Sequence, residues 1–269
     1  MAGISTIRNQ VNKLIKEVLS EQSEVAKYFA TLDFKSDRFK PENRTYLPEG
    51  ITIKEYFCCS TIPALFGFYF TSEFHLSFLN FLCKVAENIP PSLYEKNVSD
   101  HWLIDCMKYY FHSMNIGEYI RSSIGDILLH LIRDESLLQY ALKKNFVAIL
   151  SKVDQFIPIM ISGFIENLSI IPISIRSLLK RVAKIGKTQN KPYPRLFTLF
   201  MDCILIPSLT NLKAYNVLPP SFHLDPNPNG SMSIIQAIIA SFKFVFNSDT
   251  LRKKFPGFEP KAISSAKMS

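Results

Sequence analysis

The chain has 269 residues, which is long enough to bury a substantial core as one large helical domain or as two small ones. Hydrophobic residues make up 47% and charged residues 20%, and 9 glycines stand against 22 phenylalanines, so a disordered, collagen-like or glycine-rich protein is excluded. The net charge of +8 permits an acidic partner, whether nucleic acid, an anionic membrane or an acidic protein face.

The first part of the chain favours helices separated by one charged loop. Apolar residues at helical spacing predict a helix over Ile4–Leu19, and prolines and alternating charges predict a loop over Phe34–Gly50. The aromatic stretch Tyr56–Phe70 is broken by Pro63, which favours a short kinked helix over a strand. A longer helix is expected over Ser72–Glu87.

The middle of the chain continues the helical pattern. We expect a helix that is capped by Ser99 or Asp100 and runs to about Phe111. Gly117 then offers a turn. Apolar spacing predicts a helix over Ile120–Ile132, and the pattern resumes over Leu137–Leu150 after a polar break.

The last third is helical as well and is divided by proline-rich loops. We expect helices at Gln155–Leu168, Pro172–Lys184, Arg195–Ile206 and Met232–Phe246, a stop near Pro207, a linker at Gly186–Pro194 and a loop at Leu218–Gly230. No stretch alternates as a strand would. The sequence therefore predicts an all-α protein.

Composition and motifs favour a cytoplasmic protein that is no autonomous enzyme. The start lacks the apolar core of a signal peptide, and charged residues or prolines interrupt the apolar windows before they reach the length of a membrane span. The five cysteines form no metal-binding pattern, and we interpret them as thiols of a reducing compartment. Glycine-rich phosphate loops and the common hydrolase motifs are absent from the sequence.

The segment Cys203–Leu218, CILIPSLTNLKAYNVL, carries the clearest resemblance. It resembles the signature of Ras GTPase-activating (Ras-GAP) domains, in which a helix reading Phe-Leu-Arg precedes Pro-Ala, a turn with asparagine and a basic residue, and an aromatic-Asn-hydrophobic end. Pro207 takes the proline place, Asn211 that of the asparagine and Lys213 that of the basic residue. Tyr215 opens the closing triplet.

Other segments resemble the same family. The stretch Lys108–Glu135 looks like its finger-loop region, and Leu65–Val85 looks like its first long helix pair. Ile171, Pro172 and Arg176 open a helix as the family's Ile-Pro-…-Arg segment does. Together the likeness covers about residues 56–246.

Two departures concern the arginines of that family. His112 stands where the family has its catalytic arginine finger, and Cys203 where it has a supporting arginine. The finger neutralises charge on the transferring phosphoryl group and accelerates hydrolysis by about 10³ to 10⁵. Histidine lacks the bidentate guanidinium fork, although a rearranged loop would allow Arg121 to substitute.

The resemblance implies a multi-helix Ras-GAP-like bundle over residues 51–250, preceded by a helix and loop over 1–50 that pack on it and followed by a basic, flexible tail over 251–269. It implies a small GTPase of the Ras superfamily as partner, and no nucleic acid. The GTPase-binding residues would be Arg176, Cys203, Asn211 and Lys213.

The resemblance also implies weak or absent acceleration of GTP hydrolysis. The chain would need no cofactor, because the GTPase carries GTP and Mg²⁺. The alternative is a helical adaptor that keeps this architecture and binds another protein or an anionic membrane surface. We expect the protein to be cytoplasmic, with peripheral contact to membranes.

Overall fold

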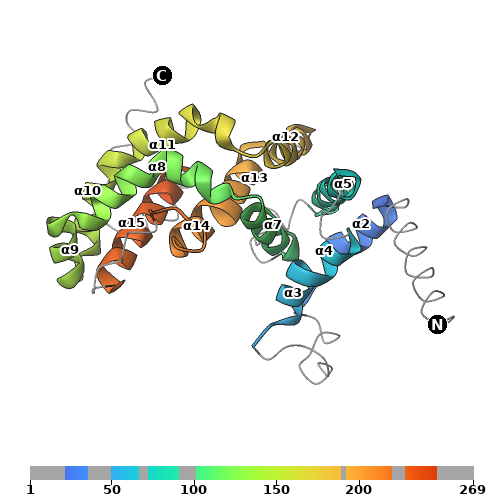
Figure 1. The fold of residues 1–269 in the computed structure, drawn as a ribbon, viewed down its shortest axis with the longest axis horizontal. Helices are drawn as coiled ribbons and strands as arrows, with labels where there is room; N and C mark the ends of the chain where they lie inside the picture. Colours follow the sequence, from blue (N-terminus) through green and yellow to red (C-terminus); the bar gives the residue numbers. More distant parts are fainter. Residues whose placement is uncertain are drawn as a thin grey trace. The chain divides into compact units, whose positions relative to one another are not determined.

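The computed structural model describes residues 22–35, 50–66, 72–90, 101–188, 192–219 and 228–246. Every regular element in these ranges is a helix, which confirms the predicted all-α class (Figure 1). The helix expected over Ile4–Leu19 and the tail over 251–269 lie outside the described residues. The chain forms two compact units, Met1–Phe111 with Ile173–Leu199 (unit 1) and His112–Pro172 with Phe200–Ser269 (unit 2).

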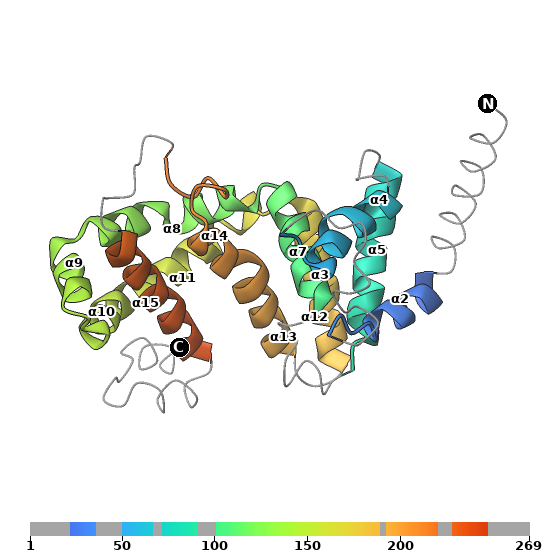
Figure 2. The ribbon, with the colours of Figure 1, turned by 90° about the horizontal axis from the view of Figure 1, so that it is seen from below.

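Unit 1 is built around α5, against which α2 and α12 pack, while α13 packs on α12. Its helices are α2 (Gln22–Ala30), α3 (Ile53–Tyr56), α4 (Ile62–Leu65), α5 (Ser72–Asn88), nearly all of α7 (Trp102–Ser113), α12 (Ile173–Thr188) and α13 (Pro192–Leu199) (Figure 2). A hydrogen bond from Arg181 to the side chain of Asn80 joins α12 to α5. The helix α2 was missed by the sequence analysis, although Ala26 and Ala30, one turn apart, form its buried stripe.

Aromatic rings form the core of unit 1. The ring of Phe29 on α2 meets Phe81 of α5 edge to face at 5.6 Å, and Trp102 of α7 packs on Phe57 at 5.2 Å. The indole Nε1 of Trp102 donates to the carbonyl oxygen of Phe29 at 2.8 Å, so this large side chain is buried with its polar atom satisfied. These contacts fix the start of α7 against the end of α2.

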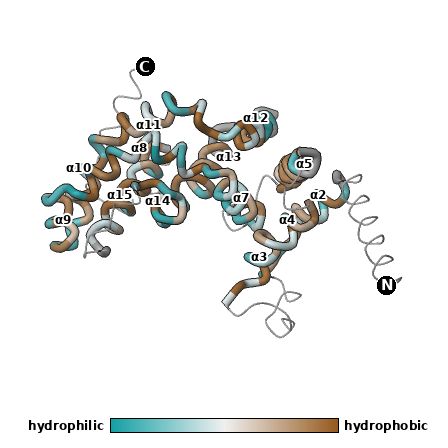
Figure 3. The backbone as a smooth tube through the Cα atoms, in the orientation of Figure 1, coloured by the Kyte–Doolittle hydropathy of each residue, from teal (hydrophilic) through white to brown (hydrophobic). Residues whose placement is uncertain are grey.

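Unit 2 packs its longest helices around Phe164. Its helices are α8 (Ile116–Arg133), α9 (Glu135–Leu142), α10 (Phe146–Val153), α11 (Ile157–Glu166), α14 (Ile206–Thr210) and α15 (Pro228–Phe246). The ring of Phe164 contacts Phe200 at 5.1 Å and Phe242 at 5.8 Å, and the hydroxyl of Tyr119 donates to its carbonyl oxygen at 2.9 Å. Figure 3 shows the apolar tracts of α10, α11 and α15 that supply this core.

One stretch of the described chain, Phe146–Glu166, is long and apolar enough to cross a membrane by those two criteria alone. It consists of α10, a short 3-10 turn at Asp154–Phe156, and α11. Its α10 part packs against α15 and its α11 part against α8. The interior helices of water-soluble proteins satisfy the same criteria, so this stretch is weak evidence for membrane insertion.

Two prolines that were expected to interrupt helices lie inside continuous helical paths. Pro63 and Pro207 each occupy one of the first two positions of an α-helix that follows a π-helical segment, Phe57–Thr61 and Phe200–Leu205 respectively. A π-turn shifts the hydrogen-bond pattern by one residue, so the missing proline amide need not break the path. The helix expected to stop near Pro207 therefore continues to Thr210.

The structure differs from the expected helix boundaries at three further places. The turn assigned to Gly117 is formed two residues earlier by Asn115, in the left-handed conformation with φ of 55°. The helical pattern over Leu137–Leu150 is interrupted after Leu142, where α9 ends. The linker expected at Gly186–Pro194 is largely helical, because α12 extends to Thr188 and α13 starts at Pro192.

Gly117 lies inside α8 at a position where another part of unit 2 leaves no space for a side chain. A Cβ at this position would lie 1.7 Å from the carbonyl oxygen of Tyr215. Gly163 of α11 has the same role against α8, since its Cβ would lie 2.2 Å from the carbonyl oxygen of Ser123. Both glycines permit backbone approaches that any larger residue would prevent.

We predict that Gly117→Ala destabilises the protein by about 1–3 kcal/mol or more, because the overlap with Tyr215 outweighs the higher helix propensity of alanine. The matched control is Gly125→Ala, whose Cβ would meet the flexible side chain of Arg121 at 3.4 Å and the carbonyl oxygen of Val217 at 3.5 Å. This control should be neutral or stabilising by up to ~1 kcal/mol. Urea unfolding of both variants measures the difference, and equal effects would contradict the close approach.

Candidate functional site

The structure brings five of the six predicted site residues into unit 2. These are His112, Arg121, Cys203, Asn211 and Lys213. Arg176 is exposed on α12 in unit 1 and is not among the residues that unit 2 gathers. We therefore describe the site from unit 2 alone.

His112 is held against the turn that follows α14. Its Nε2 lies 3.1 Å from the carbonyl oxygen of Ala214, and its ring contacts the ring of Tyr215 at a centroid distance of 4.6 Å. A carbonyl oxygen only accepts, so Nε2 carries the hydrogen of this bond. In the neutral imidazole, Nδ1 then has a lone pair and no hydrogen to donate.

The turn at residues 211–217 is fixed by its own hydrogen bonds. The side-chain oxygen of Asn211 accepts from the amide of Ala214 at 3.3 Å, and the amide of Val217 donates to the carbonyl of Leu212 at 2.9 Å. Asn216 adopts the left-handed conformation with φ of 51°, which asparagine tolerates better than most residues. The turn therefore holds its shape without help from a ligand.

One face of α8 lies along this turn. Gly117 and Gly125, eight residues apart, approach the backbone carbonyls of Tyr215 and Val217. Residues at i, i+4 and i+8 share a helix face, so Arg121 is on the same face between the two glycines. Two of the segments that resemble the family, Lys108–Glu135 and Cys203–Leu218, thus meet in unit 2, although more than 90 residues separate the positions in contact.

We define the α8–turn face as the exposed residues Arg121, Asn211 and Lys213 together with His112. The two cationic side chains, Arg121 and Lys213, form no hydrogen bond or ion pair with the described residues. An arginine supplies several donors in a planar fork, and a lysine supplies a point charge. This face is suited to bind an acidic or phosphorylated surface.

The predicted contact residue Cys203 is buried in the π-helical segment before α14. A thiol in this position packs in the core and does not touch a partner surface. Burial also raises the pKa of Cys58, and it raises the pKa of Cys83 to about 11. These two thiols are therefore inert at neutral pH.

Sequence reasoning assigned no role to Gly117 or Tyr215 in building the face. Tyr215 was matched only as part of the closing triplet, yet its ring and carbonyl contact His112 and α8. A glycine in the middle of a helical pattern is a weak sign of close packing, and it was taken here for a turn. The partner of such a glycine cannot be read from the sequence.

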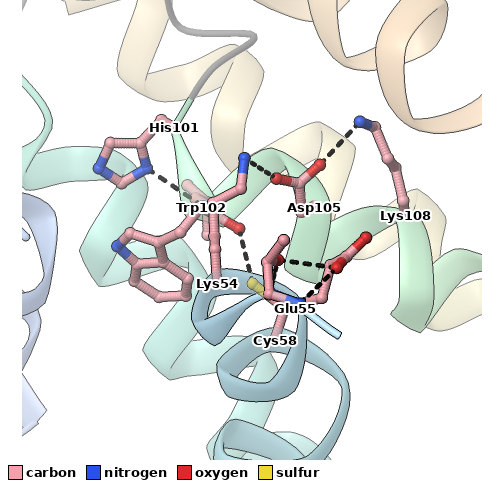
Figure 4. A network of polar contacts seen from close by, with 9 residues as sticks. Lys54, Glu55, Cys58, His101, Trp102, Asp105 and Lys108 are labelled. Atoms are coloured by element: carbon pink, nitrogen blue, oxygen red, sulfur yellow. Dashed lines mark hydrogen bonds and ion pairs between the residues drawn. The ribbon is translucent and has the colours of Figure 1, made fainter. Parts of the chain in front are cut away.

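A second polar cluster lies in unit 1, where Asp105 of α7 pairs with two lysines (Figure 4). Its carboxylate oxygens lie 2.5 Å from Nζ of Lys54 and 2.8 Å from Nζ of Lys108. The thiol of Cys58 donates to the carbonyl of Trp102 at 3.3 Å. These groups satisfy one another and hold α3 against α7, so we interpret the cluster as structural.

His101 caps the start of α7 in the same cluster. Its Nδ1 accepts from the amide of Leu103 at 3.1 Å, and its Nε2 lies 3.1 Å from the carbonyl of Ala30. Burial, opposed by the hydrogen bond to Ala30, lowers the pKa of His101 below its ordinary value. Protonation would remove the acceptor for Leu103 and place a charge near Lys54.

A pocket of about 280 Å³ lies between α8 and α11 in unit 2. Its lining includes the carboxylates of Asp126 and Glu166 and the hydroxyls of Ser122 and Ser162. Both of these carboxylates and both of these serines are on exposed residues, where they are open to solvent. We assign no chemistry to this pocket.

We predict that stability falls as the pH drops below the ordinary histidine value of about 6.5, because the folded state binds fewer protons at His101 than the unfolded state does. The loss is at most about 1.4 kcal/mol per pH unit. His101→Asn keeps a capping acceptor and should flatten the profile between pH 7 and pH 5. The exposed control His130→Asn should keep the slope. The urea midpoints of the three proteins across this pH range measure the effect. A slope that persists in His101→Asn would show that His101 is not the source of the pH dependence.

Comparison with known proteins assigns no family to this chain. No family model matches it, and no curated protein or solved structure shows significant similarity to it. Support for a function therefore comes from the residues of unit 2 and from the sequence resemblance.

Proposed function

We propose that this chain is a Ras-GAP-like, non-enzymatic binding module that docks on a small GTPase through the α8–turn face. The observation that carries the proposal is the contact between His112 and the 211–217 turn. The resemblance relates each of these segments to the GTPase-binding part of the same family. Their contact in unit 2 is what a shared binding surface requires.

Charge supports the same partner. Arg121 and Lys213 are exposed on this face, and the chain carries a net charge of +8. The nucleotide of a GTPase is anionic, and its effector face is acidic. Opposite charges raise the association rate and fix the orientation of the partners. Binding of this kind weakens as the salt concentration rises.

Strong acceleration of hydrolysis is not part of the proposal. The hydrogen on Nε2 of His112 points to Ala214, so the neutral ring has no second donor for a phosphoryl oxygen. Arg121 is the cation on this face with a guanidinium fork. Any residual acceleration would come from Arg121, with the GTPase supplying Mg²⁺ and the water-positioning residue.

We predict that the protein binds a Ras-, Rap- or Rab-type GTPase more tightly when the GTPase carries a non-hydrolysable GTP analogue than when it carries GDP. Lys213→Glu should weaken this binding by about tenfold, since it reverses a charge on the face. Lys143→Glu is the control, because it makes the same change on an exposed residue of unit 2 outside the face. Biolayer interferometry with a GTPase panel measures both.

Equal affinity for the two nucleotide states, or equal loss in both variants, would overturn the proposed function. Single-turnover hydrolysis gives an independent reading. We expect acceleration below about tenfold, and we expect Arg121→Ala to remove it while His112→Ala leaves it. A rate increase above about 10³ that depends on His112 would contradict the reading of its hydrogen bond.

A further inference from the structure

Three apolar side chains are exposed around the turn between α9 and α10. Leu142 is 60% exposed, Val147 42% and Tyr140 37%, all within eight residues. They lie in the last turn of α9 and the first turn of α10. These two helices pack against each other in unit 2 (Figure 1). We call this feature the α9–α10 tip, residues 139–147.

The tip is also positively charged. Lys143 and Lys144 are both exposed between its apolar residues. The chain from Ser136 to Val153 carries no acidic residue, and neither does α15, which packs against both α9 and α10. The carboxylates before this stretch are Glu135, which is exposed at the first position of α9, and Asp134, which is paired with Lys152 at 2.6 Å. Two cations therefore face solvent beside three apolar side chains, and neither forms an ion pair with the residues that the structure describes.

The backbone of the tip is tightly fixed, and one lysine is strained. The amide of Lys144 donates to the carbonyl of Ala141 at 3.0 Å, and the amide of Asn145 donates to that of Tyr140 at 2.9 Å. Lys144 adopts the left-handed conformation with φ of 54°. Glycine is the residue that a helix end prefers in this conformation. A lysine there gives up stability and supplies a charge, which points to a function for that charge.

We propose that the α9–α10 tip inserts into the interfacial region of an anionic lipid bilayer. Apolar side chains flanked by lysines bind such a surface by combining burial with attraction to acidic headgroups. A stable protein interface uses about 20 to 30 residues from each partner, far more than the tip offers. The tip is separate in sequence from the α8–turn face, so it serves to hold the module at a membrane whichever protein that face binds.

Sedimentation with vesicles tests the proposal on the full chain. We expect binding to vesicles of phosphatidylcholine and phosphatidylserine in equal parts, and little binding to pure phosphatidylcholine. The double variant Lys143→Ala, Lys144→Gly should bind at least about tenfold more weakly, since each lysine accounts for about fivefold. Leu142→Ser should lose about tenfold, because its side chain can no longer be buried in the bilayer.

Matched controls show whether vesicle binding depends on the tip itself or on any exposed lysine or apolar side chain. Lys180→Ala with Lys184→Ala removes the same charge from exposed positions on α12, and Ile165→Ser removes a side chain that is 63% exposed on α11. Both should bind vesicles as the wild type does. Lys144→Gly alone should raise the urea midpoint while weakening vesicle binding about fivefold, which excludes damage to the fold as the cause.

Three outcomes would overturn the proposal. Wild-type protein that fails to bind the anionic vesicles contradicts it, as do tip variants that bind like the wild type. Equal losses in the α12 control contradict it too, because they indicate a diffuse charge effect. Binding to poly-glutamate that depends on the tip, without binding to vesicles, would assign the tip to an acidic protein instead.

Discussion

The close approach of Gly117 to Tyr215 is the contact on which the candidate site depends. A Cβ at residue 117 would lie 1.7 Å from the carbonyl oxygen of Tyr215, so α8 and the turn after α14 meet backbone to backbone. This contact places Arg121 beside the turn and gives His112 its partners, Ala214 and Tyr215. With a larger residue at position 117, α8 and the turn would have to move apart to relieve this overlap, and the α8–turn face would change its shape.

Two further features of unit 2 hold the segments that make this contact. The π-helical segment Phe200–Leu205 lets the chain pass Pro207 without ending the helix, so the turn begins at a fixed place. The ring of Phe200 packs on Phe164 of α11, and Tyr119 of α8 donates to the carbonyl of Phe164. Both segments that form the face are therefore also packed on the core of unit 2.

The helical periodicity of the sequence was sufficient to predict the all-α class and the approximate place of most described helices, because apolar stripes are local signals. It failed where distant contacts decide the local structure. Gly117 was taken for a turn since its partner Tyr215 is far along the chain, and Pro207 was taken for a stop since a π-turn leaves no clear pattern. His112, Arg121, Asn211 and Lys213 were proposed together from resemblance alone, whereas the role of Tyr215 needed the fold.

Hydrogen–deuterium exchange of the complex shows whether a GTPase docks on the α8–turn face. With a GTPase bound to a GTP analogue, we expect slower exchange over residues 111–125 and 208–218 together, and unchanged exchange over the α9–α10 tip. The two segments should respond in the same complex because they form one surface. Protection confined to one of the two segments, or found only at the tip, would show that the GTPase does not dock on this face.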